Sequence, residues 1–426
     1  MELLKEVLSQ NNLGKALSKV KGNRGSGGVD GMGVKELPKH LKQHWPRITK
    51  EILNGQYCPQ PVLGVEIPKD NGGVRQLGIP TVTDRVIQQA IHQVISALYE
   101  PEFSEYSYGF RPGQNAHQAL EQAKKYINEG YQEIIDLDLK SFFDRVNHDI
   151  LMSLLLQKVK DRHLLKLIRR YLQSGLLLDG VSSPRPQGTP QGGPISPLLS
   201  NILLNELDKE LESRGHRFIR YADDCSIFVR SRRSAIRVLR TVTSFLKERL
   251  RLEVNEQKTG ICRPGKFELL GYGFVPTYQK GVKGKYNFRV ATKSFKKLKL
   301  KIKAITRKTI PMSFIERMDK LLALMRGWVN YFKLAKMWRK LKELDVWIRN
   351  RLRYCIWKQW KRPNRRMKNF MRMGVEQGLA YAWSRSRLGG WRIACSPIMK
   401  MTITLDRLAR RGYQSFEQYY LKRIHV

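Results

Sequence analysis

The chain has 426 residues, which is long enough for two to four packed units. Hydrophobic residues make up 41% of it, so hydrophobic cores are expected. The chain contains no apolar run of about 18 residues, so no membrane span is expected. Lys and Arg number 79 against 37 Asp and Glu, a formal net charge of +42. So one-sided a charge favours a partner rich in phosphate over a surface tuned only for solubility.

The positive charge is concentrated toward the C-terminus. Residues 281–426 contain 38 basic and 7 acidic residues. The same segment is rich in tryptophan and aliphatic residues, which argues against a disordered basic arm. A segment that is both basic and aromatic is typical of a folded nucleic-acid-binding surface.

Cysteine usage and the opening residues bear on the compartment. The five cysteines are scattered and form no Cys-x-x-Cys pair. They are expected to be reduced thiols of a cytosolic protein, with neither a disulfide framework nor a zinc site. The opening residues MELLKEVLSQ lack a basic stretch followed by an apolar one, so no secretory signal is expected.

Apolar periodicity predicts the elements in chain order. Short helices are expected up to about residue 60, and everything after about residue 290 is expected to be helical. The order of elements in between favours an α+β fold, with a small antiparallel sheet backed by helices on one face. The expected elements are a β-hairpin over 62–80, a helix over 84–103, a strand over 133–143, a helix over 148–175, a helix over 196–215 with Ser196 as N-cap, a hairpin over 218–229, a helix over 233–252 and a strand over 268–275.

Two adjacent acids, Asp223 and Asp224, interrupt the apolar stretch FIRYADDCSIFV. Asp-Asp is also an ordinary turn dipeptide, so the pair alone does not identify a site. A second apolar strand ends in Asp138, with Asp136 on the same face. If the two strands are neighbours in one sheet, Asp138 and Asp223 can face each other, and carboxylates that close repel. Oxygen-only ligands favour Mg²⁺, and two such ions could activate a 3′-hydroxyl and stabilise a leaving pyrophosphate.

The stretch TPQGGPISP contains two adjacent glycines, which let another backbone approach closely. A plain turn before a helix is the simple interpretation, since the proline and serine already explain one. The functional interpretation is a loop that touches an incoming base pair, with Gln191 at its edge.

These motifs stand in the order found in group II intron-encoded reverse transcriptases, or maturases, and the chain resembles that family. The resemblance covers residues 1 to about 275, and RGWVNYF at 326–332 resembles part of the family's thumb, or X, domain. The whole length is similar to the compact class C members. The matching pieces are VEIPKDNGGVRQLGIPTVTDRVIQQA, SYGFRPGQNAH, DLDLKSFFDRVNHDIL, GTPQGGPISPLLSNILLNELDKEL, RYADDCSIFV, LEVNEQKTG and LLGYGF.

The resemblance implies a right-hand polymerase of class α+β. Fingers and a palm with a ferredoxin-like antiparallel sheet would precede an α-helical thumb and a small basic helical C-terminal region. Larger relatives end in a Cys/His-rich DNA endonuclease. Because His425 is the only histidine after His216, no such nuclease is expected here. The expected domains are an N-terminal extension at 1–60, fingers and palm at 61–285, the thumb or maturase domain at 286–360, and a DNA-binding-like region at 361–426.

The resemblance also assigns the acids. Asp138, Asp223 and Asp224 match the family's catalytic aspartates. Asp138 and Asp223 would ligate both metal ions, and the Leu139 backbone is a further candidate ligand. The role of Asp224 would be closer to structural or second-sphere support. The expected cofactor is a pair of Mg²⁺ ions, with Mn²⁺ as a substitute.

Other positions match residues that contact the incoming nucleotide. Lys69 and Arg75 match the fingers residues that grip the triphosphate, which suits two cations on one hairpin. Phe143 matches the bulky residue that excludes a ribose 2′-hydroxyl, although a core phenylalanine fits the spacing equally well. Gln191 matches a residue that touches the nucleotide, and Lys258 matches a lysine proposed to protonate pyrophosphate.

The last match concerns the primer, because Leu270 and Gly271 resemble the primer grip. The implied function is an RNA-directed DNA polymerase that copies RNA into cDNA and binds intron RNA to assist splicing and retromobility. Its expected partners are structured intron RNA, an RNA template–DNA primer duplex, target DNA and dNTPs, with no membrane. It would act in the bacterial cytoplasm, associated with the nucleoid when on DNA.

Two alternatives stay open. One is a related reverse transcriptase that acts in host DNA repair or defence. The other is an RNA-binding splicing factor without polymerase activity. The intact acidic motifs argue against the latter, because binding alone needs no acids in a basic cleft.

Overall fold

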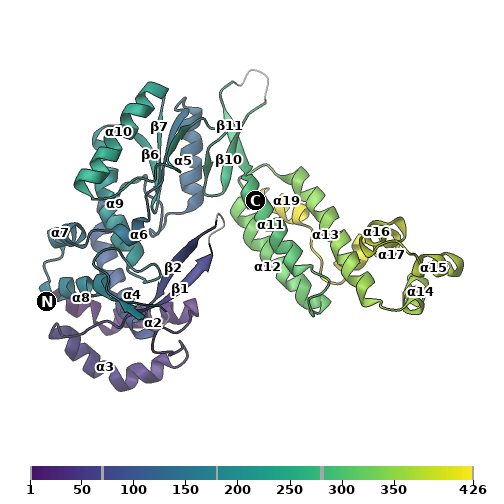
Figure 1. Cartoon of the computed structure of the whole chain (residues 1–426), viewed down its shortest axis with the longest axis horizontal. Coiled ribbons are helices and arrows are strands. Elements are labelled where there is room, and N and C mark those ends of the chain that lie inside the picture. Colours follow the sequence, from purple (N-terminus) through teal and green to yellow (C-terminus); the bar gives the residue numbers. More distant parts are fainter. Residues whose placement is uncertain (1, 69–71, 179–180, 279–282, 425–426) are drawn as a thin grey trace. The chain divides into compact units, whose positions relative to one another are not determined.

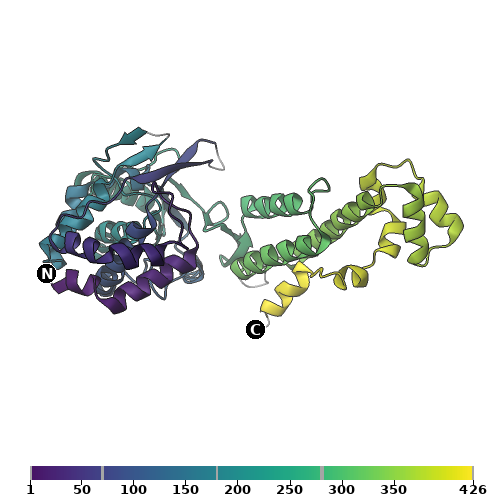
Figure 2. The ribbon, with the colours of Figure 1, turned by 90° about the horizontal axis from the view of Figure 1, so that it is seen from below.

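The structure is a computed structural model that describes residues 2–68, 72–178, 181–278 and 283–424, with Arg75 and Ser182 described by their backbone alone. The chain divides into two compact units, Met1–Pro264 and Gly265–Val426. The first mixes helices and strands, and the second is mainly helical (Figures 1 and 2). The four domains expected from the sequence are a finer division than this one, and their bounds stay predictions.

The first unit contains the segment in which the acidic motifs lie. No helix within the described residues combines the length and apolarity needed to cross a bilayer. The elements of the first unit are α1 (Glu2–Val7), α2 (Gln10–Asn23), α3 (Leu37–Leu53), β1 (Val62–Pro68), β2 (Val74–Ile79), α4 (Val82–Tyr99), η1 (Glu100–Glu102), α5 (Ala116–Asn128), β3 (Glu133–Leu137), α6 (Phe142–Arg145), α7 (His148–Lys158), α8 (Arg162–Gln173), β4 (Leu176–Leu178), β5 (Val181–Ser183), α9 (Ser196–Ser213), β6 (Arg217–Tyr221), β7 (Asp224–Val229), α10 (Arg232–Arg249) and β8 (Gly260–Cys262).

The sheet that carries the acids is four-stranded, in the order β6-β7-β3-β8. The pairs β6–β7, β3–β7 and β3–β8 are antiparallel, which confirms the small antiparallel sheet predicted from the sequence. Strand β3 lies in the interior because its apolar residues Ile134, Ile135 and Leu137 are fully buried. Helix α10 packs against β3, β7 and β8, and it lies beside the sheet in Figure 1.

The predicted hairpin over 62–80 is also present. Strands β1 and β2 pair antiparallel, with Leu63 opposite Ile79 and Pro68 opposite Val74. The outer side of β1 pairs in parallel with β4, which completes a second four-stranded sheet in the order β2-β1-β4-β5. Nothing in the apolar pattern predicted this parallel pair, because it joins segments about a hundred residues apart.

Two local predictions about helices were wrong. The helix expected over 148–175 is two helices, since Asp161 caps a new helix by accepting from the backbone nitrogens of His163 and Leu164. Ser196 does not cap α9: the cap position is Ile195, and the Ser196 hydroxyl donates instead to the Pro190 carbonyl oxygen at 2.8 Å. A contact with the preceding loop therefore overrides the capping preference of this serine.

The second unit confirms the helical tail. A small sheet in the order β11-β10-β9 precedes its helices. Helix α13 carries the buried Asp345, which accepts from the Tyr413 and Ser415 hydroxyls and from the backbone nitrogen of Phe416. One carboxylate thereby ties the last helix to the helix bundle. The elements are β9 (Glu268–Leu269), β10 (Tyr272–Pro276), β11 (Tyr286–Val290), α11 (Thr292–Ile305), α12 (Phe314–Phe332), α13 (Trp338–Gln359), α14 (Pro363–Arg372), α15 (Gln377–Ser384), α16 (Gly390–Cys395), α17 (Pro397–Thr402), α18 (Leu405–Ala409) and α19 (Phe416–Ile424).

Candidate active site

The adjacent acids lie at the tip of the β6–β7 hairpin, which confirms the predicted turn. Tyr221 is opposite Asp224, so Ala222 and Asp223 form a two-residue loop. Ala222 has a φ of 59°, the left-handed value that the first loop position of a type II′ turn requires. Asp223 is half-buried and Asp224 is exposed. The tight loop therefore fixes both carboxyl groups at one end of the sheet.

Asp138 comes to the same end from the neighbouring strand. Strands β3 and β7 are paired, with Leu137 opposite Cys225. Continuing this register by one residue places Asp138 opposite Asp224, with Asp223 one position further into the turn. The expected adjacency of the two strands is confirmed, and the directly opposite residue differs by one from the expectation. A period of two leaves such single-residue offsets undetermined by an apolar run.

A turn that follows α10 holds Asp138 in place. The Asp138 backbone nitrogen donates to the Thr259 hydroxyl at 3.1 Å, and its carbonyl oxygen accepts from the Asn255 nitrogen at 2.8 Å. The same turn brings Lys258, whose Nζ lies 3.2 Å from the nearer carboxylate oxygen of Asp138. The structure thus joins two of the predicted residues, Asp138 and Lys258. It adds Thr259, which no sequence pattern distinguished from ordinary turn residues.

The carboxyl groups at this end of the sheet repel one another. Burial, followed by the charges of Asp224 and Asp138, raises the pKa of Asp136 to about 6. Asp136 lies on β3, opposite Ser226. Its shift shows that these three side chains share one field, which a bound cation would relieve.

The donor chemistry at this end of the sheet fits Mg²⁺. The carboxyl groups supply oxygen ligands only, and Mg²⁺ usually takes one or two carboxylates and fills its shell with water and substrate phosphates. Among the residues that the structure describes, no group of three or more His, Cys, Asp or Glu side chains forms a ready metal-binding cluster.

A buried arginine supports the hairpin from below. Arg220, on β6, is fully buried and forms an ion pair with the fully buried Asp208 of α9 at 2.6 Å. Its guanidinium also donates to Asn201 Oδ1 and to the Ala222 carbonyl oxygen, both at 2.9 Å. The backbone of the loop is thereby tied to helix α9. The sequence signal was available, since a strand residue flanked by apolar neighbours and carrying a charge needs a buried partner.

The loop before α5 packs directly on the tip of the hairpin. The Gly109 carbonyl oxygen accepts from Asn201 Nδ2 at 2.9 Å, and the Tyr108 nitrogen donates to the Arg220 carbonyl oxygen at 2.8 Å. A Cβ atom at position 109 would lie 2.3 Å from the backbone nitrogen of Ala222. Only glycine permits this approach.

The predicted nucleotide-contacting residues Phe143 and Gln191 lie on segments that are joined by backbone hydrogen bonds. The Phe143 carbonyl oxygen accepts from the Thr189 nitrogen at 2.6 Å, and the Gln191 carbonyl oxygen accepts from the Gly78 nitrogen at 2.9 Å. The Phe143 ring is half-buried and packs edge-to-face on Phe142. Its two interpretations, core residue and sugar contact, therefore both remain compatible with its position.

The remaining predicted residues lie on the β1–β2 hairpin and directly after Asp138. Lys69 lies outside the described residues. Arg75 pairs through its backbone with Ile67 on the β1–β2 hairpin, and its side chain lies outside the described part. Leu139 forms an isolated bridge with Val254, which says nothing about metal binding.

Leu270 and Gly271 belong to the second unit, where they form the two-residue turn between β9 and β10. Both have positive φ, 50° and 80°, as a type I′ turn requires. The Leu270 carbonyl oxygen accepts from the Tyr331 hydroxyl at 2.9 Å, which holds the turn on α12.

Two family models match the chain. One, described as reverse transcriptase (RNA-dependent DNA polymerase), matches residues 67–274. The other, described as group II intron, maturase-specific domain, matches residues 295–374.

Individual proteins are similar to parts of the chain. Protein YkfC of Escherichia coli (strain K12) is 30% identical over 272 residues, which cover 55% of this chain and 71% of that protein. Group II intron-encoded protein LtrA of Lactococcus lactis subsp. cremoris is 35% identical over 164 residues, covering 38% of this chain and only 27% of LtrA. Among solved structures, a chain of the partial Cas6-RT-Cas1–Cas2 complex aligns with a TM-score of 0.38 and 22% identity, over 58% of this chain and 42% of that chain.

Replacing Arg220 should loosen the hairpin. We expect Arg220→Met to lower the free energy of unfolding of the first unit by about 3 to 5 kcal/mol, because it leaves the buried Asp208 charge unpaired. Adding Asp208→Leu should recover much of this loss. Arg169→Met, which removes an exposed ion pair to Asp149, should cost less than about 1 kcal/mol. Chemical denaturation checks all three, and equal costs for the two arginines would contradict the supporting role.

Asp136 should make the stability of the metal-free protein depend on pH. Because its pKa is raised in the folded state, ionising Asp136 destabilises the fold: this cost is absent below about pH 4, grows between about pH 4 and pH 6, and stays constant above about pH 6. In EDTA, Asp136→Asn should therefore gain about 2 to 3 kcal/mol relative to the unmodified protein between about pH 4 and pH 7. Denaturation at several pH values measures this, with exposed Asp149→Asn as the control. A difference that does not change with pH would contradict the raised pKa of Asp136.

Proposed function

Because the chain belongs to the family of group II intron-encoded reverse transcriptases and maturases, and is an RNA-directed DNA polymerase of that family, we propose that Asp138, Asp223 and Asp224 form its polymerase site. The observation that supports this most is the pairing of β3 with β7, which brings the end of one strand beside the tip of the β6–β7 hairpin. Two strands that are distant in sequence thus bring acids to the same end of a sheet. A protein that only bound RNA would gain nothing from placing repelling carboxylates there.

Reverse transcriptase domains depend on divalent metal in general, and we propose a pair of Mg²⁺ ions here, for which Mn²⁺ can substitute. Asp138 and Asp223 would hold them, with the Leu139 carbonyl oxygen as a further ligand. The chemistry that such ions supply is activation of the primer 3′-hydroxyl and stabilisation of charge on the leaving pyrophosphate. Asp224, the more exposed of the pair, would support the site from outside the first ligand shell.

We assign substrate contacts to side chains around these acids. Lys258 holds a proton at Nζ beside Asp138 and is our candidate for protonating the leaving pyrophosphate. Lys69 and Arg75 would grip the triphosphate from the β1–β2 hairpin, and Gln191 would touch the incoming nucleotide. Phe143, on the short helix after Asp138, would exclude a ribose 2′-hydroxyl by its size.

We assign the intron RNA and the nucleic-acid duplex mainly to the basic second half of the chain. Helix α11 is rich in lysine and contains no acidic residue, which suits a phosphate backbone. Within this half, the thumb would occupy 286–360 and a DNA-binding-like region 361–426, and the turn at Leu270 and Gly271 would serve as primer grip. Binding its intron RNA would allow the protein to assist splicing and retromobility in the bacterial cytoplasm, with target DNA as a later substrate.

Asp223→Ala should abolish primer extension. We expect the rate of DNA-primer extension on an RNA template with dNTPs and Mg²⁺ to fall by at least about three orders of magnitude. The reason is that this carboxylate would ligate the metal at the reacting atoms. Binding of structured RNA should stay unchanged. Asp149→Ala, an exposed acid on α7, is the matched control. Comparable extension by Asp223→Ala and the unmodified protein would refute the assignment.

Phe143→Ala should change the choice of sugar. Removing the ring opens space for one extra oxygen, so we expect the ratio of rNTP to dNTP incorporation to rise by about ten-fold or more. Single-nucleotide incorporation at matched concentrations measures it, and Phe142→Leu controls for altered core packing. An unchanged ratio, with extension retained, would leave Phe143 as a core residue.

A further inference from the structure

Phe110 is an unusual residue beside the catalytic hairpin. Its side chain is 57% exposed, and within the described part of the first unit it is the only aromatic side chain in the strongly exposed group. Its φ is 59°, a left-handed value that is an outlier for a bulky residue. An exposed apolar ring and a disfavoured backbone at one position both call for a physical reason.

The surrounding loop holds Phe110 in this conformation. The next residue, Arg111, forms an ion pair with Glu100 at 2.8 Å and donates to the Ser107 carbonyl oxygen at 2.7 Å. Its guanidinium also lies over the Phe103 ring, 5.3 Å from the centroid. Backbone strain persists only where neighbours over-determine it, and such positions cluster at functional sites.

The loop presents Phe110 at the catalytic hairpin. Gly109 approaches the Ala222 nitrogen so closely that a Cβ atom there would lie 2.3 Å from it. Since successive Cα atoms are about 3.8 Å apart, the Phe110 Cα lies within about 8 Å of that nitrogen. Position 110 therefore lies beside the two-residue loop that carries Asp223.

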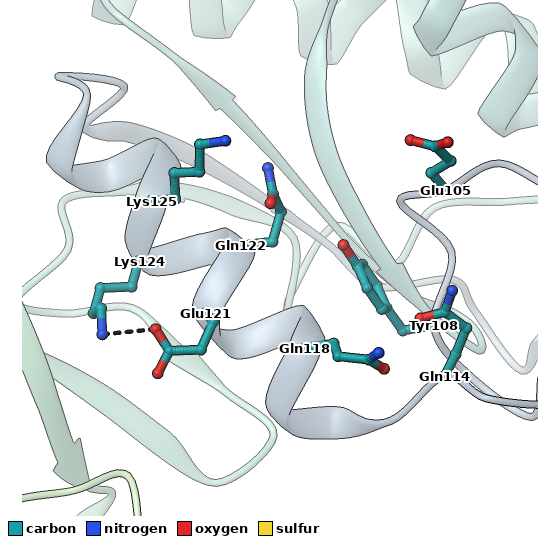
Figure 3. Close-up of a pocket in the computed structure, with 8 residues that line it drawn as sticks. All are labelled: Glu105, Tyr108, Gln114, Gln118, Glu121, Gln122, Lys124 and Lys125. Atoms are coloured by element: carbon teal, nitrogen blue, oxygen red, sulfur yellow. Dashed lines mark ion pairs between the residues drawn. The ribbon is translucent and has the colours of Figure 1, made fainter.

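The same loop borders an open groove of about 700 Å³. Glu105 and Tyr108 come from the loop, and Gln118, Gln122 and Lys125 come from helix α5 (Figure 3). Amide groups both donate and accept hydrogen bonds, as base edges and ribose hydroxyls require. The lining of the groove therefore suits a nucleic-acid strand better than an apolar ligand.

We propose that the Phe110 ring is a stacking platform for a base of the RNA template–DNA primer duplex at the polymerase site. The inference rests on the proposed polymerase function and adds a residue to it. An aromatic face stacks on any base, so the contact orients the nucleic acid without reading its sequence. The left-handed backbone turns the ring outward and keeps Gly109 against the hairpin, which explains why the strain is retained.

The test is the equilibrium affinity for a fluorescent RNA template–DNA primer duplex, measured by anisotropy without dNTPs. Phe110→Ala should weaken binding roughly 5- to 150-fold, the range of base–aromatic stacking. Phe110→Trp should bind within about three-fold of the unmodified protein, because indole also stacks. Leu156→Ala, which removes a 51%-exposed side chain on α7, should bind like the unmodified protein.

Two further measurements separate stacking from other effects. Phe110→Gly removes the ring and also relieves the strain of the left-handed backbone. It should therefore bind as weakly as Phe110→Ala, while its Tm is equal to or higher than that of Phe110→Ala. The dependence of affinity on salt should keep its slope, because no phosphate contact is lost. A photoreactive phenylalanine analogue at position 110 should cross-link to the labelled duplex.

The proposal is overturned if the unmodified protein extends primers and both Phe110→Ala and Phe110→Gly bind the duplex with an affinity within two-fold of it. Cross-links confined to the protein itself would overturn it as well, because the ring would then pack against another part of the chain. Failure of the polymerase function would look different, since the unmodified protein itself would then extend no primer.

Discussion

The mutual repulsion of carboxyl groups at one end of a sheet is the constraint around which the first unit is built. Burial, and after it the charges of Asp224 and Asp138, raise the pKa of Asp136, so the chain places acids where each disfavours the charge of the next. Such an arrangement survives only if the backbone cannot relax away from it. The antiparallel pairing of β3 with β7, the two-residue loop and the hydrogen bond that the Asp138 nitrogen donates to the Thr259 hydroxyl hold the acids in place.

Close backbone approaches at glycines connect this sheet edge to the surrounding loops. Gly109 lies against the hairpin tip, and Gly78 binds the carbonyl oxygen of Gln191. Gly192, with a φ of 135°, would place a Cβ atom 2.5 Å from the Gly78 carbonyl oxygen. At these positions a side chain would separate segments that have to touch. The loops that would meet substrate are thus fixed mainly through main-chain contacts, which leaves their side chains available for binding.

Sequence alone was sufficient for the elements with strong local signals. The β6–β7 hairpin, the β1–β2 hairpin, helix α10 and the helical tail all follow from apolar periodicity and turn residues. It was insufficient where tertiary contacts decide. The parallel β1–β4 pair and the residue opposite Asp138 depend on partners far along the chain, and the Ser196 hydroxyl is taken by Pro190 in the preceding loop. Arg220 and Thr259 were missed because their importance lies in the partners that they hold, Asp208 and Asp138.

The buried Arg220 guanidinium joins helix α9, strand β6 and the loop backbone into a single cooperative element. If the hairpin frayed on its own, a charge of this buried ion pair would be left inside the protein without its partner, which is costly. Local opening of the acidic tip would therefore cost nearly as much as unfolding the core beneath it. Motions that admit and release nucleic acid have to come from other segments, and the acids behave as the fixed reference point against which those segments move.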